Sequence, residues 1–174
     1  MSYFRSCLNI IIVALVLSGC QTLSTADINA TTQAELDRIE LPEASDRLEQ
    51  LFLRQLDTSL NQQAGLRDLA LSIDMSVTSS STLAVKGKTS SLSKSVLSVD
   101  YVLSDRLSNE ILTEGTVTAT ATSGTVSSYF GQEQSKIFAS ERLALTLADR
   151  LTQKLRLYFL SSSQKQSSST SSVQ

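Results

Sequence analysis

The apolar positions along the chain change their spacing several times, and each spacing predicts a different element. Across residues 45–61, apolar residues recur every three or four positions, which predicts an amphipathic helix. The stripe consists of Leu48, Leu51, Phe52, Leu56 and Leu60. Ser45 is the first residue of this segment and the expected N-cap, because its hydroxyl can accept from a free backbone N–H.

A period of two replaces the helical period at residue 69. Leu69, Leu71, Ile73, Met75 and Val77 alternate with polar residues, which predicts a strand with one buried face. Two further strands are expected near 97–103 and 110–122, with a turn at 105–109. Gly115 lies inside the last of these strands, where a glycine suggests a bulge. The segment 81–94 is expected to be a loop.

The helical period returns over residues 134–160. One face of this second helix carries Ile137, Ala144, Ala148, Leu151, Leu155 and Tyr158, and Leu143, Leu147 and Phe159 widen it. A short extended piece is also expected near residues 36–41, before the chain's only proline. The order is strand, helix, three strands, helix. It predicts an α+β two-layer sandwich, with two helices packed on one face of a four-stranded, mostly antiparallel sheet.

The N-terminal segment has a different pattern. Arg5 precedes about ten mostly apolar residues, too few for a spanning helix of roughly twenty. The run ends at Leu17-Ser18-Gly19-Cys20, which is similar to the bacterial lipobox. Residues 1–19 are therefore predicted to be a lipoprotein signal peptide, and Cys20 the site of S-diacylglycerol and N-acyl attachment. The alternative is an ordinary signal peptide with an incidental cysteine.

The remaining segments complete the predicted organisation. Residues 20–33 are small and polar, which indicates a lipidated tether, followed by one folded domain over 34–160. Residues 161–174 are rich in Ser and Gln and are predicted to be a disordered tail. Several acyl chains would hold the mature protein on a membrane without crossing it. Gln21, where inner-membrane lipoproteins tend to have Asp, favours the periplasmic side of the outer membrane.

The composition argues against several classes of function. The chain has 15 Lys and Arg against 17 Asp and Glu, and no histidine. Loss of Arg5 with the signal leaves 14 basic residues and a charge of −3, which argues against a nucleic-acid partner. Without histidine, the usual general base and the commonest metal ligand are missing. We therefore expect no enzyme, no metal site and no cofactor other than the covalent lipid.

The C-terminal part of the chain resembles a known family, the LPS-assembly lipoproteins called LptE, in their alphaproteobacterial form. The resemblance lies in Ser128-Tyr129, Phe138-Ala139, Glu141-Arg142, Leu147-Ala148-Asp149 and Leu157-Tyr158-Phe159. Residues 46–60 are similar to the family's first helix and 98–117 to its central hairpin. With the lipobox, the resemblance covers about residues 15–160. It departs after Cys20, where Gln21 to Thr25 replace the Gly-Phe-Arg-Pro-Leu run of many members.

This resemblance implies a two-helix, four-stranded fold and a non-enzymatic role. Members of the family sit as a plug inside the outer-membrane β-barrel translocon (LptD) and assist lipopolysaccharide insertion into the outer leaflet. The rival hypotheses are an accessory lipoprotein of a periplasmic lipid-transport ABC system and a purely structural envelope lipoprotein. A structural lipoprotein would be expected to carry a peptidoglycan-binding pattern, which the sequence lacks.

Three lysines are the candidate ligand-binding residues. Lys86, Lys88 and Lys94 lie in a segment without acidic residues, and their charge suits the phosphates of lipopolysaccharide. The alternative is a solvated hairpin. Arg106, in the following turn, is a weaker candidate.

Two other features have two interpretations each. The Thr-rich strand 116–122 is either a plain exposed face or a surface that meets the polar inner wall of a barrel. Tyr129 either anchors the last helix or belongs to that interface.

Overall fold

The computed structural model describes residues 25–61, 65–84, 91–124 and 128–170. Residues 1–31 and 32–174 form two units, and the packing described below belongs to the second. In chain order, the elements are α2 (Thr25–Leu36), β1 (Ile39–Glu40), α3 (Arg47–Leu60), β2 (Leu69–Ala84), β3 (Ser91–Asp105), β4 (Ile111–Gly124) and α4 (Tyr129–Thr170).

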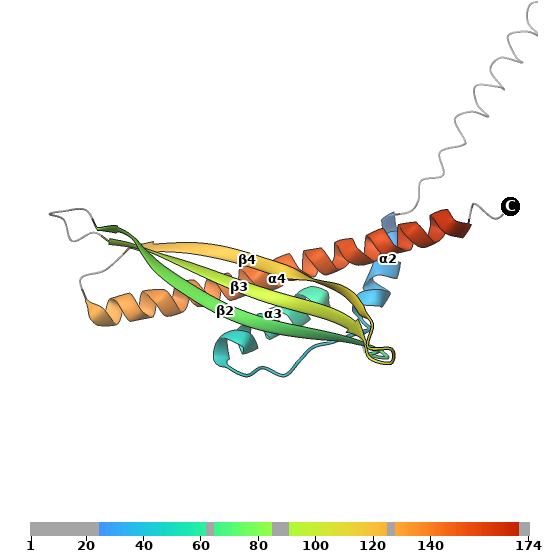
Figure 1. The fold of residues 1–174 in the computed structure, drawn as a ribbon, viewed down its shortest axis with the longest axis horizontal. Coiled ribbons are helices and arrows are strands. Elements are labelled where there is room, and N and C mark those ends of the chain that lie inside the picture. The colour runs from blue at the N-terminus through green and yellow to red at the C-terminus, as the bar shows by residue number, and fades with distance from the viewer. Residues whose placement is uncertain (1–24, 62–64, 85–90, 125–127, 171–174) are drawn as a thin grey trace, which may run out of the picture. The chain divides into compact units, whose positions relative to one another are not determined.

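The four strands form one sheet in the order β1-β2-β3-β4. β1 pairs with β2 in parallel, through Ile39↔Leu69 and Glu40↔Ala70. β2, β3 and β4 form an antiparallel meander. In Figure 1, α3 and α4 lie behind the meander, so the helices cover one face of the sheet and leave the other open. The predicted two-layer α+β sandwich is confirmed.

The core lies between the sheet and the two helices. Its fully buried side chains include Phe52 and Leu56 of α3, Leu97 and Leu103 of β3, and Leu151 of α4. These residues come from the predicted stripes, whose periods match the elements that formed. Two stripe positions are more exposed than expected: Val77 is 48% and Ile137 41% exposed. Both line a hollow of about 320 Å³ beside the first turn of α3, where the sandwich is less filled.

The ends of α3 are capped by side chains from other positions than the sequence suggested. The N-cap is Asp46, not Ser45: its carboxylate accepts from the Glu49 backbone N–H at 2.8 Å. Ser45 instead donates its own N–H to the Glu49 carboxylate at 2.6 Å. Glu49 thus bonds the residue before the N-cap, whereas in a capping box it would bond the N-cap itself. At the other end, Gln33 donates to the Leu60 and Asn61 carbonyls at 2.7 and 3.1 Å, which have no partner within the helix.

Two helices extend into segments that the sequence predicted to be unstructured. α2 covers Thr25–Leu36 and therefore most of the predicted tether 20–33. It lacks a clear apolar stripe, but its C-terminal part is held because Leu36 and Thr32 are buried.

α4 continues to Thr170 and therefore includes residues 161–170 of the predicted tail. Extending a formed helix is far less costly than nucleating one. The hydroxyls of Ser161, Ser162 and Ser163 also donate back to carbonyls three residues earlier, at 2.8 to 2.9 Å.

The meander is longer than predicted, and its irregularity lies elsewhere. β2 and β3 pair as far as Ala84↔Ser91, so most of the predicted loop 81–94 is strand. Gly115 pairs regularly with Tyr101; the register shift falls at Leu103/Ser104 instead. Gly115 has a different role, because a Cβ there would meet the Tyr101 hydroxyl at 3.2 Å. The glycine therefore makes room for the tyrosine ring.

Candidate functional site

The open face of the sheet is built from the even-numbered residues of β2, β3 and β4. Apolar odd-numbered residues face the helices, so the polar positions turn outward. We call this surface the hydroxyl face. Its members are Ser72, Asp74, Ser76, Thr78, Ser80, Lys94, Val96, Ser98, Asp100, Val102, Ser104, Glu114, Thr116, Thr118, Thr120 and Thr122.

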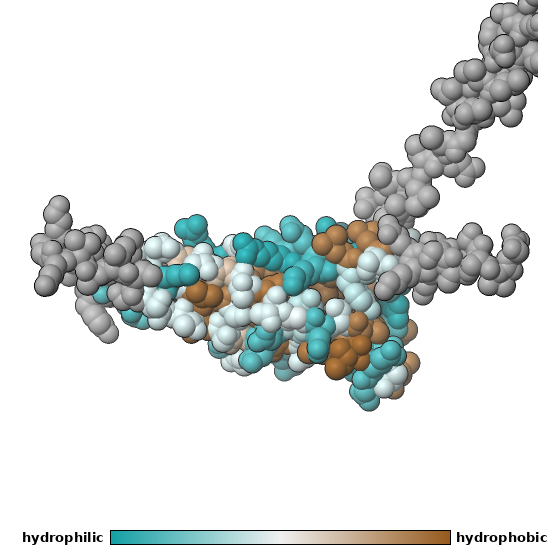
Figure 2. Space-filling model, turned by 45° about the horizontal axis from the view of Figure 1, so that its top comes forward, coloured by the Kyte–Doolittle hydropathy of each residue, from teal (hydrophilic) through white to brown (hydrophobic). Residues whose placement is uncertain are grey.

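The register arranges these side chains in rows across the three strands. Ser76, Ser98 and Thr118 form one row, and Ser80, Lys94 and Thr122 form another. Most members are small and carry a hydroxyl, so the face offers many hydrogen-bond donors and acceptors. Because these side chains are short, the surface is nearly flat. Figure 2 shows one side of the molecule, on which white and teal residues are mixed with separate brown patches.

The three candidate lysines fall in different places. Lys94 is exposed on β3, between Ser80 and Thr122, and not in a loop as predicted. Its location follows from the β2–β3 pairing, which continues beyond it. Lys86 and Lys88 lie outside the described residues. The structure therefore puts Lys94 on the hydroxyl face and leaves the other two lysines as predictions.

A pair of carboxylates, which the sequence analysis did not single out, lies in the middle of the hydroxyl face. Asp74 and Asp100 are direct neighbours across β2 and β3, and the Thr116 hydroxyl donates to Asp100. The signal in the sequence was their even-numbered position within two predicted strands. Like charges placed directly opposite each other are destabilising, so this row is a local strain on the sheet.

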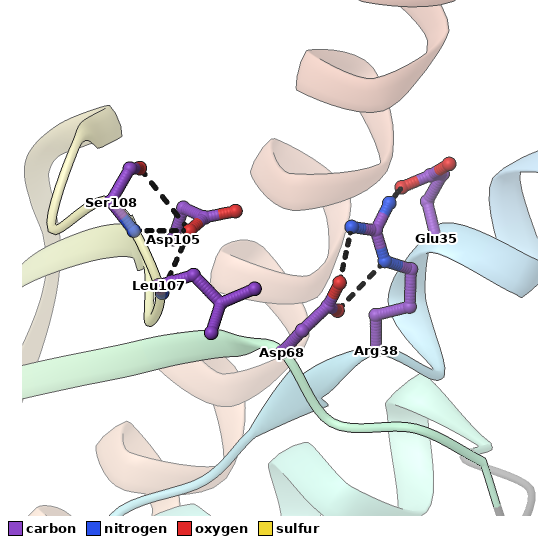
Figure 3. Close-up of polar contacts among 6 residues, drawn as sticks. All are labelled: Glu35, Arg38, Asp68, Asp105, Leu107 and Ser108. Atoms are coloured by element: carbon purple, nitrogen blue, oxygen red, sulfur yellow. Dashed lines mark hydrogen bonds and ion pairs between the residues drawn. The ribbon is translucent and has the colours of Figure 1, made fainter.

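A second polar cluster joins the start of β2 to the end of α2 (Figure 3). The Arg38 guanidinium donates to both Asp68 carboxylate oxygens at 2.8 and 2.7 Å and to Glu35 at 2.6 Å. The hydrogen bonds from Arg38 lower the pKa of the Asp68 carboxyl, while the hydrogen bond to Asp68 raises the pKa of Arg38. This is an ion pair that fixes β1 against β2.

The turn between β3 and β4 was predicted at residues 105–109 and is confirmed. Asp105 accepts from the Ser108 and Leu107 backbone N–H groups at 2.8 Å each, as Figure 3 shows. These two bonds lower the pKa of the Asp105 carboxyl. Arg106, the weaker ligand candidate, pairs with Glu40. Its charge is thus engaged within the fold.

Of the two remaining predicted residues, the structure describes the position of Tyr129 but not that of Cys20. Tyr129 is the first residue of α4, and both interpretations of it stay predictions. Cys20 lies outside the described residues.

Within the ranges that the structure describes, no helix combines the length and apolar character needed to cross a bilayer. In that same part of the chain, no three His, Cys, Asp or Glu residues gather into a group that could hold a metal ion.

Comparison with solved structures finds similar chains. A "putative lipoprotein" from Caulobacter crescentus CB15 is 18% identical, with a TM-score of 0.59, over 75% of this chain and 96% of that one. A minor lipoprotein from Acinetobacter baumannii is 25% identical, with a TM-score of 0.46, over 68% of this chain and 90% of that one. No family model matches the sequence. No curated protein matches it either.

The class defined by these observations is a small α+β sandwich with one covered and one open sheet face. The Caulobacter structure shares that fold. The resemblance to the LptE family remains a prediction from the sequence.

Proposed function

We propose that the protein is a lipid-anchored envelope protein with no catalytic role. The sequence supports the anchor, because Leu17-Ser18-Gly19-Cys20 closes an apolar run too short to span a bilayer. The Caulobacter protein of the same fold is also described as a lipoprotein. Gln21 after the cysteine supports an outer-membrane, periplasm-facing location.

We further propose that its partner is the lipopolysaccharide translocon barrel, inside which it acts as a plug and assembly factor. The hydroxyl face carries this proposal. Barrel lumens are polar, and a sheet face of short hydroxyl side chains can lie against such a wall without burying large apolar groups or many charges. An apolar partner would leave these hydroxyls without hydrogen bonds, which is costly.

Assistance in lipopolysaccharide insertion is the finer part of the proposal. Lys94 projects from the hydroxyl face near the end of the β2–β3 hairpin, and Lys86 and Lys88 are close to it in sequence. Lysine is a flexible point charge that can hold phosphates and release them. The proposed ligand contact is therefore at this end of the sheet.

Site-specific photo-crosslinking tests the plug function. A photoreactive amino acid replaces Thr118 on the hydroxyl face or, as the control, Gln153 on an exposed position of α4. The lipidated full chain is crosslinked in intact cells and the product is identified by mass spectrometry. We expect position 118 to crosslink to a large outer-membrane β-barrel, and position 153 to do so much less.

Two results would contradict the plug function. Crosslinking of Thr118 to components of an ABC transporter would favour the accessory lipoprotein of a lipid-transport system. Equal crosslinking from positions 118 and 153 would show that the hydroxyl face is not an interface.

A further inference from the structure

β4 is an edge of the sheet, and part of its outer side is covered by side chains from α4. The Thr116 carbonyl accepts from the Lys154 ammonium at 3.2 Å, and the Thr118 carbonyl accepts from Arg150. These carbonyls therefore point away from β3. Backbone direction in a strand repeats every second residue. The N–H and C=O groups of Thr120 and Thr122 consequently point to the same outer side.

Beyond Thr118, the strand edge and the helix enclose an open groove. Its volume is about 600 Å³, and it is lined by residues 119–123 of β4 and by α4 residues including Phe138, Arg142 and Leu143. Known ligand sites span roughly 300–1,000 Å³. Five strand residues extend about 17 Å, so the groove has the length of a short extended peptide.

The groove is cationic although the whole chain has a formal net charge of −2. Arg142 and Arg150 line it, and none of its lining residues is Asp or Glu. Within the described residues, the Arg150 guanidinium donates only to the Thr118 carbonyl. Within the part of the chain that the structure describes, the Arg142 guanidinium has no hydrogen-bond or ion-pair partner. A carboxylate at this position would satisfy it.

An apolar contact point adjoins the arginines. Phe138 is 60% exposed although it lines the groove, and Leu143 forms a buried part of the floor. A ligand that fits the whole groove must therefore offer alternating backbone donors and acceptors, an acidic group and an apolar group. A small anion only accepts hydrogen bonds and leaves the β4 carbonyls without a donor.

We propose that this groove binds an extended, acidic segment of a partner protein, which adds to β4 as a further strand. Its main chain bonds the outward N–H and C=O groups of Thr120 and Thr122. An acidic side chain pairs with Arg142, and an apolar side chain packs on Phe138. Strand addition of this kind obtains affinity from the backbone and specificity from alternate side chains. The site is separate from the hydroxyl face and does not depend on the proposed barrel.

Selection from a displayed library of random short peptides tests this proposal on the lipidated full chain in detergent. Thr120→Pro is the diagnostic variant, because it removes an outward N–H without removing a bond to β3, and edge strands tolerate proline there. Thr120→Ala is the matched control. Selected peptides should carry Asp or Glu and bind Thr120→Pro about three- to tenfold more weakly than Thr120→Ala.

Two further readouts separate strand addition from general adhesion. Arg142→Gln should weaken acidic peptides but not their Gln-substituted versions, and added salt should reduce that difference. Amide hydrogen exchange at Thr120 and Thr122 should slow when peptide is bound.

The proposal is overturned if selection enriches no peptide, or if enriched peptides bind both Thr120 variants equally. It is also overturned if the chain dimerises through this edge, as shown by a dimer in sedimentation that Thr120→Pro abolishes.

Discussion

Arg38 and Asp68 connect the segment before β1 to the segment before β2 through two parallel hydrogen bonds of 2.8 and 2.7 Å. The two side chains are only 38% and 22% exposed, so this pair is less screened than a typical surface ion pair. Directly beside it, the Leu69 backbone N–H donates to the Arg38 carbonyl at 3.1 Å. The pair thus secures the shortest strand of the sheet.

Replacing Asp68 by Asn should lower the free energy of unfolding by about 1 kcal/mol, since a neutral amide pairs poorly with the guanidinium. Urea unfolding of the full chain measures this change. Glu110→Gln is the control, because Glu110 is exposed and its carboxylate makes no hydrogen bond or ion pair with any described residue. Asp68→Asn should lower the free energy of unfolding less in the Arg38→Gln variant than in the wild type. Simple additivity of the two changes would show that the pair contributes nothing.

Acid should destabilise the protein through Asp68 and Asp105. Arg38 lowers the pKa of Asp68, and the Ser108 and Leu107 N–H groups lower the pKa of Asp105, both below the ordinary value of 3.8. Each carboxylate therefore contributes stability above that value and loses it as the pH falls through its lower folded-state pKa. The urea midpoint should decrease between about pH 6 and about pH 3. The decrease should be smaller in Asp105→Asn; an equally steep decrease would contradict the assignment for Asp105.

The facing carboxylates Asp74 and Asp100 give a prediction of opposite sign. Asp74→Asn should stabilise the protein by about 0.3 kcal/mol, because it removes repulsion across β2 and β3. The gain should shrink at high salt, which screens the wild-type repulsion. Glu114→Gln is the matched control, since Glu114 is exposed on β4 but lies opposite Val102. Thermal unfolding at two salt concentrations measures the gain. A gain of equal size at both concentrations would contradict repulsion as its cause.

Cys20→Ala should release the protein from membranes, since the thiol that we propose as the attachment point of the diacylglyceryl group is lost. Cell fractionation followed by immunoblotting measures the effect. Cys7→Ala is the control, because Cys7 lies within the predicted signal peptide and should leave the anchor intact. Membrane retention of the Cys20 variant would remove the lipoprotein hypothesis.

Changing Lys86, Lys88 and Lys94 together to Gln should weaken lipopolysaccharide binding about three- to tenfold, given the small contribution of each exposed charge pair. The salt dependence of binding should decrease as well. Lys136→Gln serves as the control, because Lys136 is equally a surface lysine but lies on α4 next to Glu133. If affinity is unchanged in the triple variant, the hairpin is only solvated.

The sequence predicted the elements that have a strong period, because burial of one face determines both the period and the fold. The stripe of α3 and the alternation of β2 led to the correct elements and largely to the correct core. α2 was missed because it has no apolar stripe, and its position depends on contacts such as Gln33 to Leu60, which are 27 residues apart.

The candidate site was predictable only in part, for a related physical reason. The outward-facing hydroxyls of 116–122 follow from alternation alone. The partners of each residue depend on the register, which places Lys94 beside Thr122 and Asp74 opposite Asp100. The groove beside β4 depends further on the path of α4 over the strand edge, and no local pattern encodes that path.

The short parallel pairing of β1 has a consequence for mechanics and folding order. The β2–β4 meander is built from neighbouring hairpins and closes short loops, so it is expected to form early, whereas β1 must return across α3 to pair at two positions. A force applied to the chain through its N-terminal end would then load Ile39↔Leu69, Glu40↔Ala70 and the Arg38–Asp68 pair before any part of the meander. β1 would therefore separate from β2 first under load, and the β2–β4 meander would stay folded.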